Sequence, residues 1–149
     1  MRAVIQRVLR ATVRVDDRIA GAIQRGFVVL LGVRKEDTQA DADYLVDKVI
    51  NLRVFPDVKD KMNCSIADIA GSLLVVSQFT VYASTARGRR PSFDRAAAPE
   101  QARALYEYFI QAARARGIHV ETGVFQAAME VELVNQGPVT ILCDSEKAL

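Results

Sequence analysis

The sequence predicts an α+β fold as a single domain over residues 1–149, in which largely antiparallel β-sheets form a barrel-like or sandwich-like core under two main covering helices. Three observations favour this class. Segments rich in β-branched residues open and close the chain, two amphipathic segments with helix-start signals lie between them, and the length is typical of one domain. Half of the residues are hydrophobic and a quarter are charged, which is the composition of an ordinary globular protein.

Strand signals dominate the first part of the chain. Residues 1–15 mix β-branched residues with regularly recurring arginines, which predicts a long, partly exposed strand. Asp16 and Asp17 favour a turn, after which residues 18–24 return as the second arm of a hairpin. The apolar run FVVLLGV that follows Gly26 suits a strand buried on both faces.

Two segments carry helix signals. Thr38 is a suitable N-cap for the segment TQADADYLVDKVINL, and Asp41 places an acidic group in its first turn. Pro99 stands at the first position of a second helix, EQARALYEYFIQAARAR, and Gly117 is expected to end it.

The remaining segments predict further strands joined by loops. Residues 56–71 read as a loop followed by irregular structure, and Ser72–Tyr82 gives the strongest strand signal in the chain. Three more strands are expected at 118–122, 129–134 and 139–143.

Charge and composition exclude several functional classes. Twenty basic and eighteen acidic residues leave a formal charge of +2, which is too small for a protein that binds nucleic acid by charge alone, so we expect no DNA partner. No apolar segment has the length of a membrane span or the pattern of a signal peptide. We therefore expect a cytoplasmic protein without membrane contacts.

Few residues are suited to metal or cofactor chemistry. His119 is the single histidine, it has no evident partner, and it reads as a surface or structural residue. Cys64 and Cys143 lack the spacing of a metal site; a reduced pair fits a cytoplasmic protein, and a disulfide stays open. We expect neither a metal nor a cofactor.

Polar residues interrupt the strand signal at Ser77, Gln78 and Thr80. If the strand continues, Ser77 and Phe79 share one face and Gln78 and Thr80 share the other. This pattern fits the floor of a polar pocket, and it equally fits a strand that emerges into solvent. No histidine, lysine or aspartate stands beside Ser77 or Thr80 to activate a hydroxyl.

Two further segments admit a functional interpretation. The Gly137-Pro138 pair predicts a bend between two strands, which is either a plain turn or a rigid set of unpaired carbonyls that accept an ammonium group. Arg87, Arg89 and Arg90 form a basic loop, which is either a solvated surface or a set of phosphate contacts for an RNA-linked substrate.

Taken together, these motifs resemble a known family. SQFT at 77–80, RRPSF at 89–93 and NQGPVT at 135–140 stand in the order and spacing of D-aminoacyl-tRNA deacylases of the bacterial and eukaryotic type. The opening MRAVIQRV, the FVVLLGV segment and KMN at 61–63 fit the same family, so the resemblance covers the whole chain. Gln136 departs from the pattern, which more often has an acidic residue there.

The resemblance implies an activity and an assembly. Family members hydrolyse the ester between a D-amino acid and the 3′-terminal ribose of tRNA, and similar members also remove mischarged glycine. They are homodimers with active sites at the subunit interface. Each subunit inserts a Gly-Pro turn with a cis peptide bond into the pocket of its partner. Gly137 and Pro138 would be this chiral selector, and Arg7 is matched to a residue that holds the turn, although it equally reads as a strand-surface residue.

The resemblance also assigns catalytic roles. It implies that the 2′-hydroxyl of the terminal adenosine assists hydrolysis, with contacts from Gln78, Phe79 and Thr80. An older view of the family makes Thr80 a nucleophile, but the sequence places no base beside it, which favours the RNA-assisted route.

Substrate-binding roles follow from the same resemblance. Ser77 would contact the substrate, and Phe125 and Met129 would line the adenosine pocket, although core packing explains these two residues nearly as well. Two other classes of function stay open: a non-catalytic RNA-binding module that uses the basic loop, and a dimeric interaction protein whose Gly-Pro turn only locks its partner.

Overall fold

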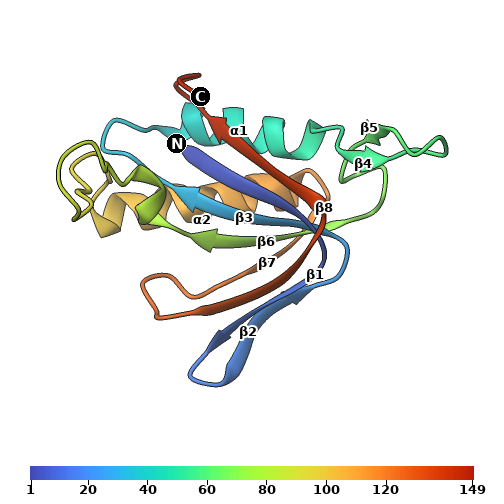
Figure 1. Ribbon diagram of the computed structural model, residues 1–149, viewed down its shortest axis with the longest axis horizontal. Coiled ribbons are helices and arrows are strands. Elements are labelled where there is room, and N and C mark those ends of the chain that lie inside the picture. Colours follow the sequence, from blue (N-terminus) through green and yellow to red (C-terminus); the bar gives the residue numbers. More distant parts are fainter.

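The computed structural model describes residues 1–149 and contains one large mixed sheet, a small second sheet and two long helices (Figure 1). In Figure 1 the hairpin of β1 and β2 projects away from the helices, and β8 runs alongside β1. The strands are β1 (Arg2–Val15), β2 (Arg18–Ile23), β3 (Gly26–Gly32), β4 (Phe55–Pro56), β5 (Met62–Cys64), β6 (Ser72–Ser77), β7 (His119–Thr122) and β8 (Glu130–Asp144), and the helices are α1 (Gln39–Asn51), the 3-10 helix η1 (Phe79–Tyr82) and α2 (Pro99–Ala115).

The large sheet has the order β2-β1-β3-β6-β7, with β8 on the other side of β1. Strand β1 pairs antiparallel with β2, β3 and β8, whereas the β3–β6 and β6–β7 pairs are parallel. Parallel neighbours need crossover connections, and α1 and α2 lie within these connections. The predicted α+β class with two main helices is confirmed, and the parallel pairs make the sheet mixed.

The sheet curls because β1 changes partners along its length. Residues 2–8 of β1 pair with β3, and residues 11–15 pair with β2. The β1–β8 register shifts twice between Gln6 and Arg10, which is the signature of bulges that bend a strand. The second half of β1 therefore folds over the sheet together with β2 and the start of β8, which produces a barrel-like shape.

The core lies on both faces of this curved sheet. Phe27 and Val29 face the helices and belong to the larger apolar cluster, which α1 and α2 cover. Val28 points to the opposite face and packs in a smaller cluster under the folded-over part of β1 and β2. Successive side chains of a strand point to opposite faces, so β3 is buried on both faces as predicted.

Local signals of the sequence are confirmed at the ends of several elements. Thr38 precedes α1, and its backbone N–H donates to the Asp41 carboxylate at 2.8 Å. Gly117 follows α2 with φ +82°, in the left-handed region that suits glycine after a helix. Asp16 and Asp17 form the turn between β1 and β2, with φ of 49° and 64°.

The predicted strand Ser72–Tyr82 is too long. Strand β6 ends at Ser77, opposite Leu31 near the end of its partner β3, and the Gln78 N–H donates to the Leu31 carbonyl at 2.8 Å. Beyond this point no neighbouring strand continues the ladder, and the chain coils into η1. The expectation that Ser77 and Phe79 share one strand face was therefore wrong.

Two other predicted boundaries were wrong. The expected strands 129–134 and 139–143 form the single strand β8, because β1 continues alongside and accommodates Gly137-Pro138 through its register shifts. The expected loop and irregular segment at 56–71 contains β5 and the end of β4, which together form a short hairpin. Strands of two and three residues are too short to produce a periodic pattern.

A buried ionic cluster ties both ends of the chain to the sheet. The Met1 ammonium lies 2.7 Å from the Asp37 carboxylate, and both groups are fully buried. Asp37 also accepts hydrogen bonds from the backbone N–H and Nε of Arg34, at 2.7 and 3.0 Å. Arg34 in turn pairs with Glu146 of the C-terminal segment. Cys64 and Cys143 are both free.

Neither α1 nor α2 combines the length and the apolar character that a helix needs to cross a lipid bilayer.

Candidate active site

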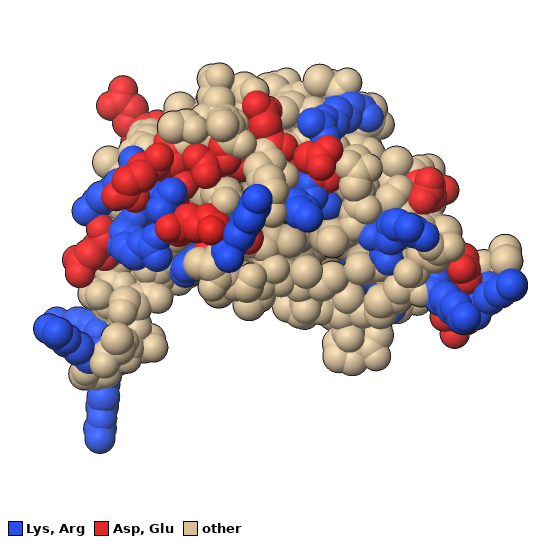
Figure 2. All heavy atoms as spheres, turned by 90° about the horizontal axis from the view of Figure 1, so that it is seen from above, with Lys and Arg blue, Asp and Glu red and all other residues tan.

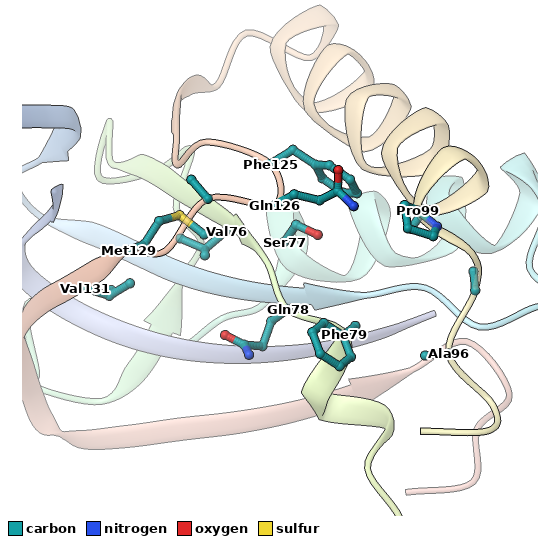
Figure 3. A pocket seen from close by; sticks show the side chains of 13 residues that line it. Val76, Ser77, Gln78, Phe79, Ala96, Pro99, Phe125, Gln126, Met129 and Val131 are labelled. Atoms are coloured by element: carbon teal, nitrogen blue, oxygen red, sulfur yellow. The ribbon is translucent and has the colours of Figure 1, made fainter. Parts of the chain in front are cut away.

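A cavity of about 640 Å³ opens at the end of β6, between the segment that leads into α2 and the segment that joins β7 to β8 (Figure 3). This volume is typical of small-ligand sites. The structure brings five of the residues singled out in the sequence to its wall: Ser77, Gln78, Phe79, Phe125 and Met129. In Figure 3 Ser77 lies between Phe125, which is drawn above it, and Gln78, which is drawn below it, and Met129 lies to the left.

The end of β6 supplies one side of the cavity. The first hydrogen bond of η1 runs from the Val81 N–H to the Gln78 carbonyl. The N–H groups of Phe79 and Thr80 precede this bond, so the 3-10 turn itself provides no acceptor for them. The strand-to-helix junction thus offers backbone donors beside the polar side chains of Ser77 and Gln78.

An aromatic platform supplies the other side. The ring of Phe125 packs at 5.8 Å from the ring of Tyr106, and the Arg103 guanidinium lies 4.8 Å from the centre of the Phe125 ring. The Tyr106 hydroxyl donates to the Val75 carbonyl at 3.0 Å, and burial raises the pKa of Tyr106 to about 12. Tyr106 therefore stays protonated at neutral pH and fixes the position of Phe125.

The cavity wall contains no charged side chain. Its polar side chains are Ser77, Gln78 and Gln126, and the other residues are apolar: Val76, Phe79, Pro99, Phe125, Met129, Val131 and alanines 96, 97, 102 and 127. Such a site recognises a ligand through shape, stacking and hydrogen bonds, and it holds no side chain suited to act as a general base at neutral pH.

Thr80 does not line the cavity. Its side chain is exposed, and its hydroxyl contacts the side-chain amide of Gln78, which donates to it. An amide does not take up the proton that a nucleophilic hydroxyl must lose. The geometry around Thr80 therefore lacks the partner that the nucleophile interpretation requires.

Gly137 and Pro138 lie in the middle of β8, are exposed, and stand outside the cavity of their own chain. The peptide bond between them is cis. Asn135 braces this corner: its Oδ1 accepts from the Val139 N–H at 2.7 Å, and its Nδ2 donates to the Val139 carbonyl at 3.1 Å.

Arg7 braces the corner from the opposite side. Its Nε donates to the Gln136 carbonyl at 3.0 Å, and its Nη1 donates to the Val54 carbonyl at 2.5 Å. The residue is only 8% exposed, so the interpretation of Arg7 as a strand-surface residue was wrong. A guanidinium that bridges two backbone segments fixes the corner as a rigid unit.

The basic loop adjoins the cavity. The ring of Phe93, in this loop, packs edge-to-face on Phe79 at 5.0 Å. Arg87, Arg89 and Arg90 are exposed and form no ion pair. Basic side chains project from the left end of the molecule in Figure 2, the end at which this loop lies in Figure 1.

Sequence reasoning missed part of the site. It did not single out Asn135 as a brace, nor Gln126 and the small residues that leave the cavity open. The run Ala96-Ala97-Ala98 before Pro99 was an available signal, because small residues at the entry to a helix leave space beside it. His119 lies away from the cavity, is exposed, and stands 3.5 Å from the Glu121 carboxylate.

Comparisons with known proteins match the whole chain. The model of the D-Tyr-tRNA(Tyr) deacylase family matches residues 4–144. A D-aminoacyl-tRNA deacylase of Koribacter versatilis is 58% identical over 147 residues, which cover 99% of each chain. A solved structure described as a c-Myc DNA unwinding element binding protein is 41% identical, with a TM-score of 0.92 over 97% of this chain and 98% of the other. A structure described as a probable eukaryotic D-amino acid tRNA deacylase shares the fold, with a TM-score of 0.85 at 18% identity over 96% of this chain and 98% of the other. The chain belongs to the D-Tyr-tRNA(Tyr) deacylase family.

Proposed function

We propose that this chain hydrolyses the ester between a D-amino acid and the 3′-terminal ribose of tRNA, and that it acts as a homodimer. Family membership supports the reaction class. One observation supports a site shared between two subunits: Gly137 and Pro138 form a rigid, exposed corner that stands outside the cavity of their own chain. A corner of this kind is available to enter the cavity of a second subunit.

The corner selects for handedness through the main chain. In the cavity of the partner, the carbonyls of Gly137 and Pro138 accept the α-ammonium of the substrate, and the wall they form leaves no room for an L side chain. Because every amino acid carries the same ammonium, this arrangement rejects L substrates whatever their side chain. A clash combined with an unpaired ammonium costs several kcal/mol, on the order of 1–3 kcal/mol for the unpaired group alone.

Hydrolysis then needs a positioned water rather than a protein nucleophile. The water oxygen attacks the ester carbonyl carbon, the bond between this carbon and the ribose oxygen breaks, and the ribose oxygen receives a proton. The N–H groups of Phe79 and Thr80, with Gln78, stabilise the oxyanion, and the neighbouring 2′-hydroxyl of the adenosine assists the proton transfer. Ser77, Phe125 and Met129 hold the aminoacyl-adenosine.

The partner is aminoacyl-tRNA, and the location is the cytoplasm, where this RNA is used. The arginines at 87, 89 and 90 contact phosphates beside the cavity, which compensates for the small net charge. A cavity closed by an aromatic platform accepts a nucleotide end rather than a duplex, so we expect no specific DNA binding. Glycine, which has no side chain to clash, is a second substrate when it is mischarged.

The defining test compares D-Tyr-tRNA, L-Tyr-tRNA and Gly-tRNA under identical conditions. We expect the protein to release D-tyrosine and glycine while L-Tyr-tRNA survives. Equal rates for the D and L esters would eliminate the proposal. Retention of tRNA in a filter-binding assay without release of any amino acid would instead favour a non-catalytic RNA-binding module.

A mixing experiment tests whether the corner acts in the partner subunit. Gly137→Ala disables the corner, and Ala127→Trp fills part of the cavity. When the two inactive variants are refolded together, half of the dimers are mixed, and each mixed dimer has one intact site. We therefore expect about a quarter of wild-type activity from the mixture, as two-fold symmetry requires. No recovery, with mixed dimers verified by differential tags, would place both elements in the same subunit.

Removal of the Thr80 hydroxyl separates the two proposed routes. We expect Thr80→Ala to reduce kcat for D-Tyr-tRNA by less than about tenfold, because the RNA-assisted route uses the backbone N–H of this residue. Loss of a true nucleophile costs about a millionfold. Single-turnover kinetics measure the step, and thermal unfolding verifies that the variant is folded. A decrease of kcat by about a millionfold in a folded variant would instead support Thr80 as the nucleophile.

A further inference from the structure

A second hollow adjoins the cavity and has no part in the mechanism above. It forms a groove of about 680 Å³ between one face of α2 and the segment that follows β7. Phe125 lines both the cavity and the groove, so the two hollows meet at this ring. A ligand too long for the cavity has a continuous path past Phe125 into the groove.

The groove has the charge pattern of a phosphate-binding surface. Arg103 and Arg114 line it from α2, and Glu107 is its only acidic residue. Arg114 is partly engaged, because it donates to the Val120 carbonyl at 2.8 Å. Arg103 is exposed and forms no ion pair; its guanidinium rests 4.8 Å from the centre of the Phe125 ring. The free cation therefore stands at the boundary between the two hollows.

This boundary is where a linking phosphate must lie. In an RNA chain the 5′-phosphate of the last nucleoside joins it to the preceding one. If the cavity holds the terminal adenosine, the phosphate emerges at its rim and the preceding nucleoside lies beyond. Single-stranded nucleic acid is commonly held by such a combination of aromatic rings and arginines.

From this arrangement we infer that the groove between α2 and Val124 is a subsite for the penultimate nucleotide of the tRNA 3′ end, and that Arg103 binds the linking phosphate. The inference rests on the proposed function, since it requires the terminal adenosine in the cavity. Every tRNA ends in CCA, so the nucleotide is a cytidine. Glu107, although it repels phosphate, is suited to accept from the exocyclic amino group of cytosine. Val124, which is 45% exposed, offers an apolar contact to the base.

The experiment compares two small substrates that differ by one nucleotide: the 3′-D-tyrosyl ester of adenosine and the 3′-D-tyrosyl ester of the dinucleotide CpA. For the wild-type protein we expect the added cytidine and phosphate to lower KM by about tenfold, the usual effect of a charge-assisted hydrogen bond. We expect kcat to stay unchanged, because the phosphate is remote from the ester.

Arg103→Ala should abolish the KM advantage of the dinucleotide over the adenosine ester. Arg103→Lys should preserve part of the advantage, because it keeps the charge. Arg18→Ala, which removes an exposed arginine of β2, serves as the matched control and should behave like the wild type. Thermal unfolding verifies that each variant is folded.

Three results would overturn the inference. The first is a dinucleotide advantage that survives Arg103→Ala. The second is an equal loss on both substrates, which would make Arg103 a support for Phe125 alone. The third is an advantage that Arg89→Ala removes in place of Arg103→Ala, which would place the linking phosphate at the basic loop instead of at the groove. Wild-type protein that hydrolyses neither ester nor D-Tyr-tRNA would reject the proposed function itself, a result distinct from these three.

Discussion

We expect Gly137→Ala to lower kcat/KM for D-Tyr-tRNA by about a hundredfold or more. Gly137 has a backbone φ of +133°, a value that L-amino acids with a side chain rarely adopt. A Cβ at this position would lie 2.8 Å from Cγ2 of Val139 and 3.1 Å from Nη2 of Arg7. Neither neighbour moves away easily, since Val139 is β-branched and Arg7 is held by two backbone carbonyls. The corner itself must shift, and a displacement of about 1 Å in a positioning element costs about a hundredfold in rate.

Gly117→Ala is the matched control for this prediction. Gly117 also has a positive φ, +82°, but a Cβ there would meet no atom within 4 Å. It therefore places a side chain on a residue with positive φ without the clash, at a cost of roughly 1 kcal/mol in stability. Deacylation of D-Tyr-tRNA and L-Tyr-tRNA should be measured for both variants and the wild type. If Gly137→Ala kept the wild-type rates and the wild-type preference for the D ester, the corner would have no role in the mechanism.

We expect Asp37→Ala to lower the free energy of unfolding by about 3–5 kcal/mol, the usual cost of removing one partner from a buried ion pair. The substitution leaves the fully buried Met1 ammonium without its ion-pair partner, and its remaining hydrogen bond goes to the Ser145 hydroxyl at 2.6 Å. It also removes the two hydrogen bonds that the backbone N–H and the Nε of Arg34 donate to Asp37. The bond from Nε is the largest cause of the raised pKa of the Arg34 guanidinium, whereas burial lowers this pKa. The N-terminus and the C-terminal segment therefore lose their common anchor.

The neighbouring variant Glu36→Ala provides the comparison. The Glu36 carboxylate lies 3.7 Å from the same arginine but is 66% exposed, so its loss should cost less than about 1 kcal/mol. Urea unfolding at one fixed protein concentration measures both variants, because the proposed function requires a dimer and the stability of a dimer depends on concentration. Similar midpoints for the two variants would mean that the buried cluster contributes no more than a surface pair.

Elements with local signals were predictable from the sequence. Helix α1 begins after Thr38 and α2 ends before Gly117, because caps act within one turn of the residues that form them. Strand ends depend on neighbours far away in the sequence. Strand β6 stops at Ser77 because β3 ends beside it, and β8 continues through Gly137-Pro138 because β1 runs alongside. No pattern within 72–82 or 129–143 contains that information.

The same distinction applies to the site. Ser77, Gln78 and Phe79 reach the cavity wall together because they are consecutive at the junction where β6 ends and η1 begins. The burial of Arg7 continues the alternation of Ala3 and Ile5, and it is Val8 that breaks this period beside the register shift. The carbonyl partners of Arg7 were not predictable, because they belong to Val54 and Gln136, far away in the sequence. The groove beside Phe125 arises where α2 meets the segment after β7, a contact that sequence periodicity does not specify.

The uncharged wall of the cavity has a consequence for acid–base behaviour. No residue that lines it gains or loses a proton near neutral pH, so under the proposed function titration belongs to the substrate. Its amino group deprotonates at about pH 8, as ordinary α-amino groups do. The neutral amino group has one N–H donor fewer than the ammonium and no positive charge, so the main-chain oxygens that accept from it bind it more weakly. Alkaline solution therefore weakens recognition of the ester while every group around it keeps its ionisation state.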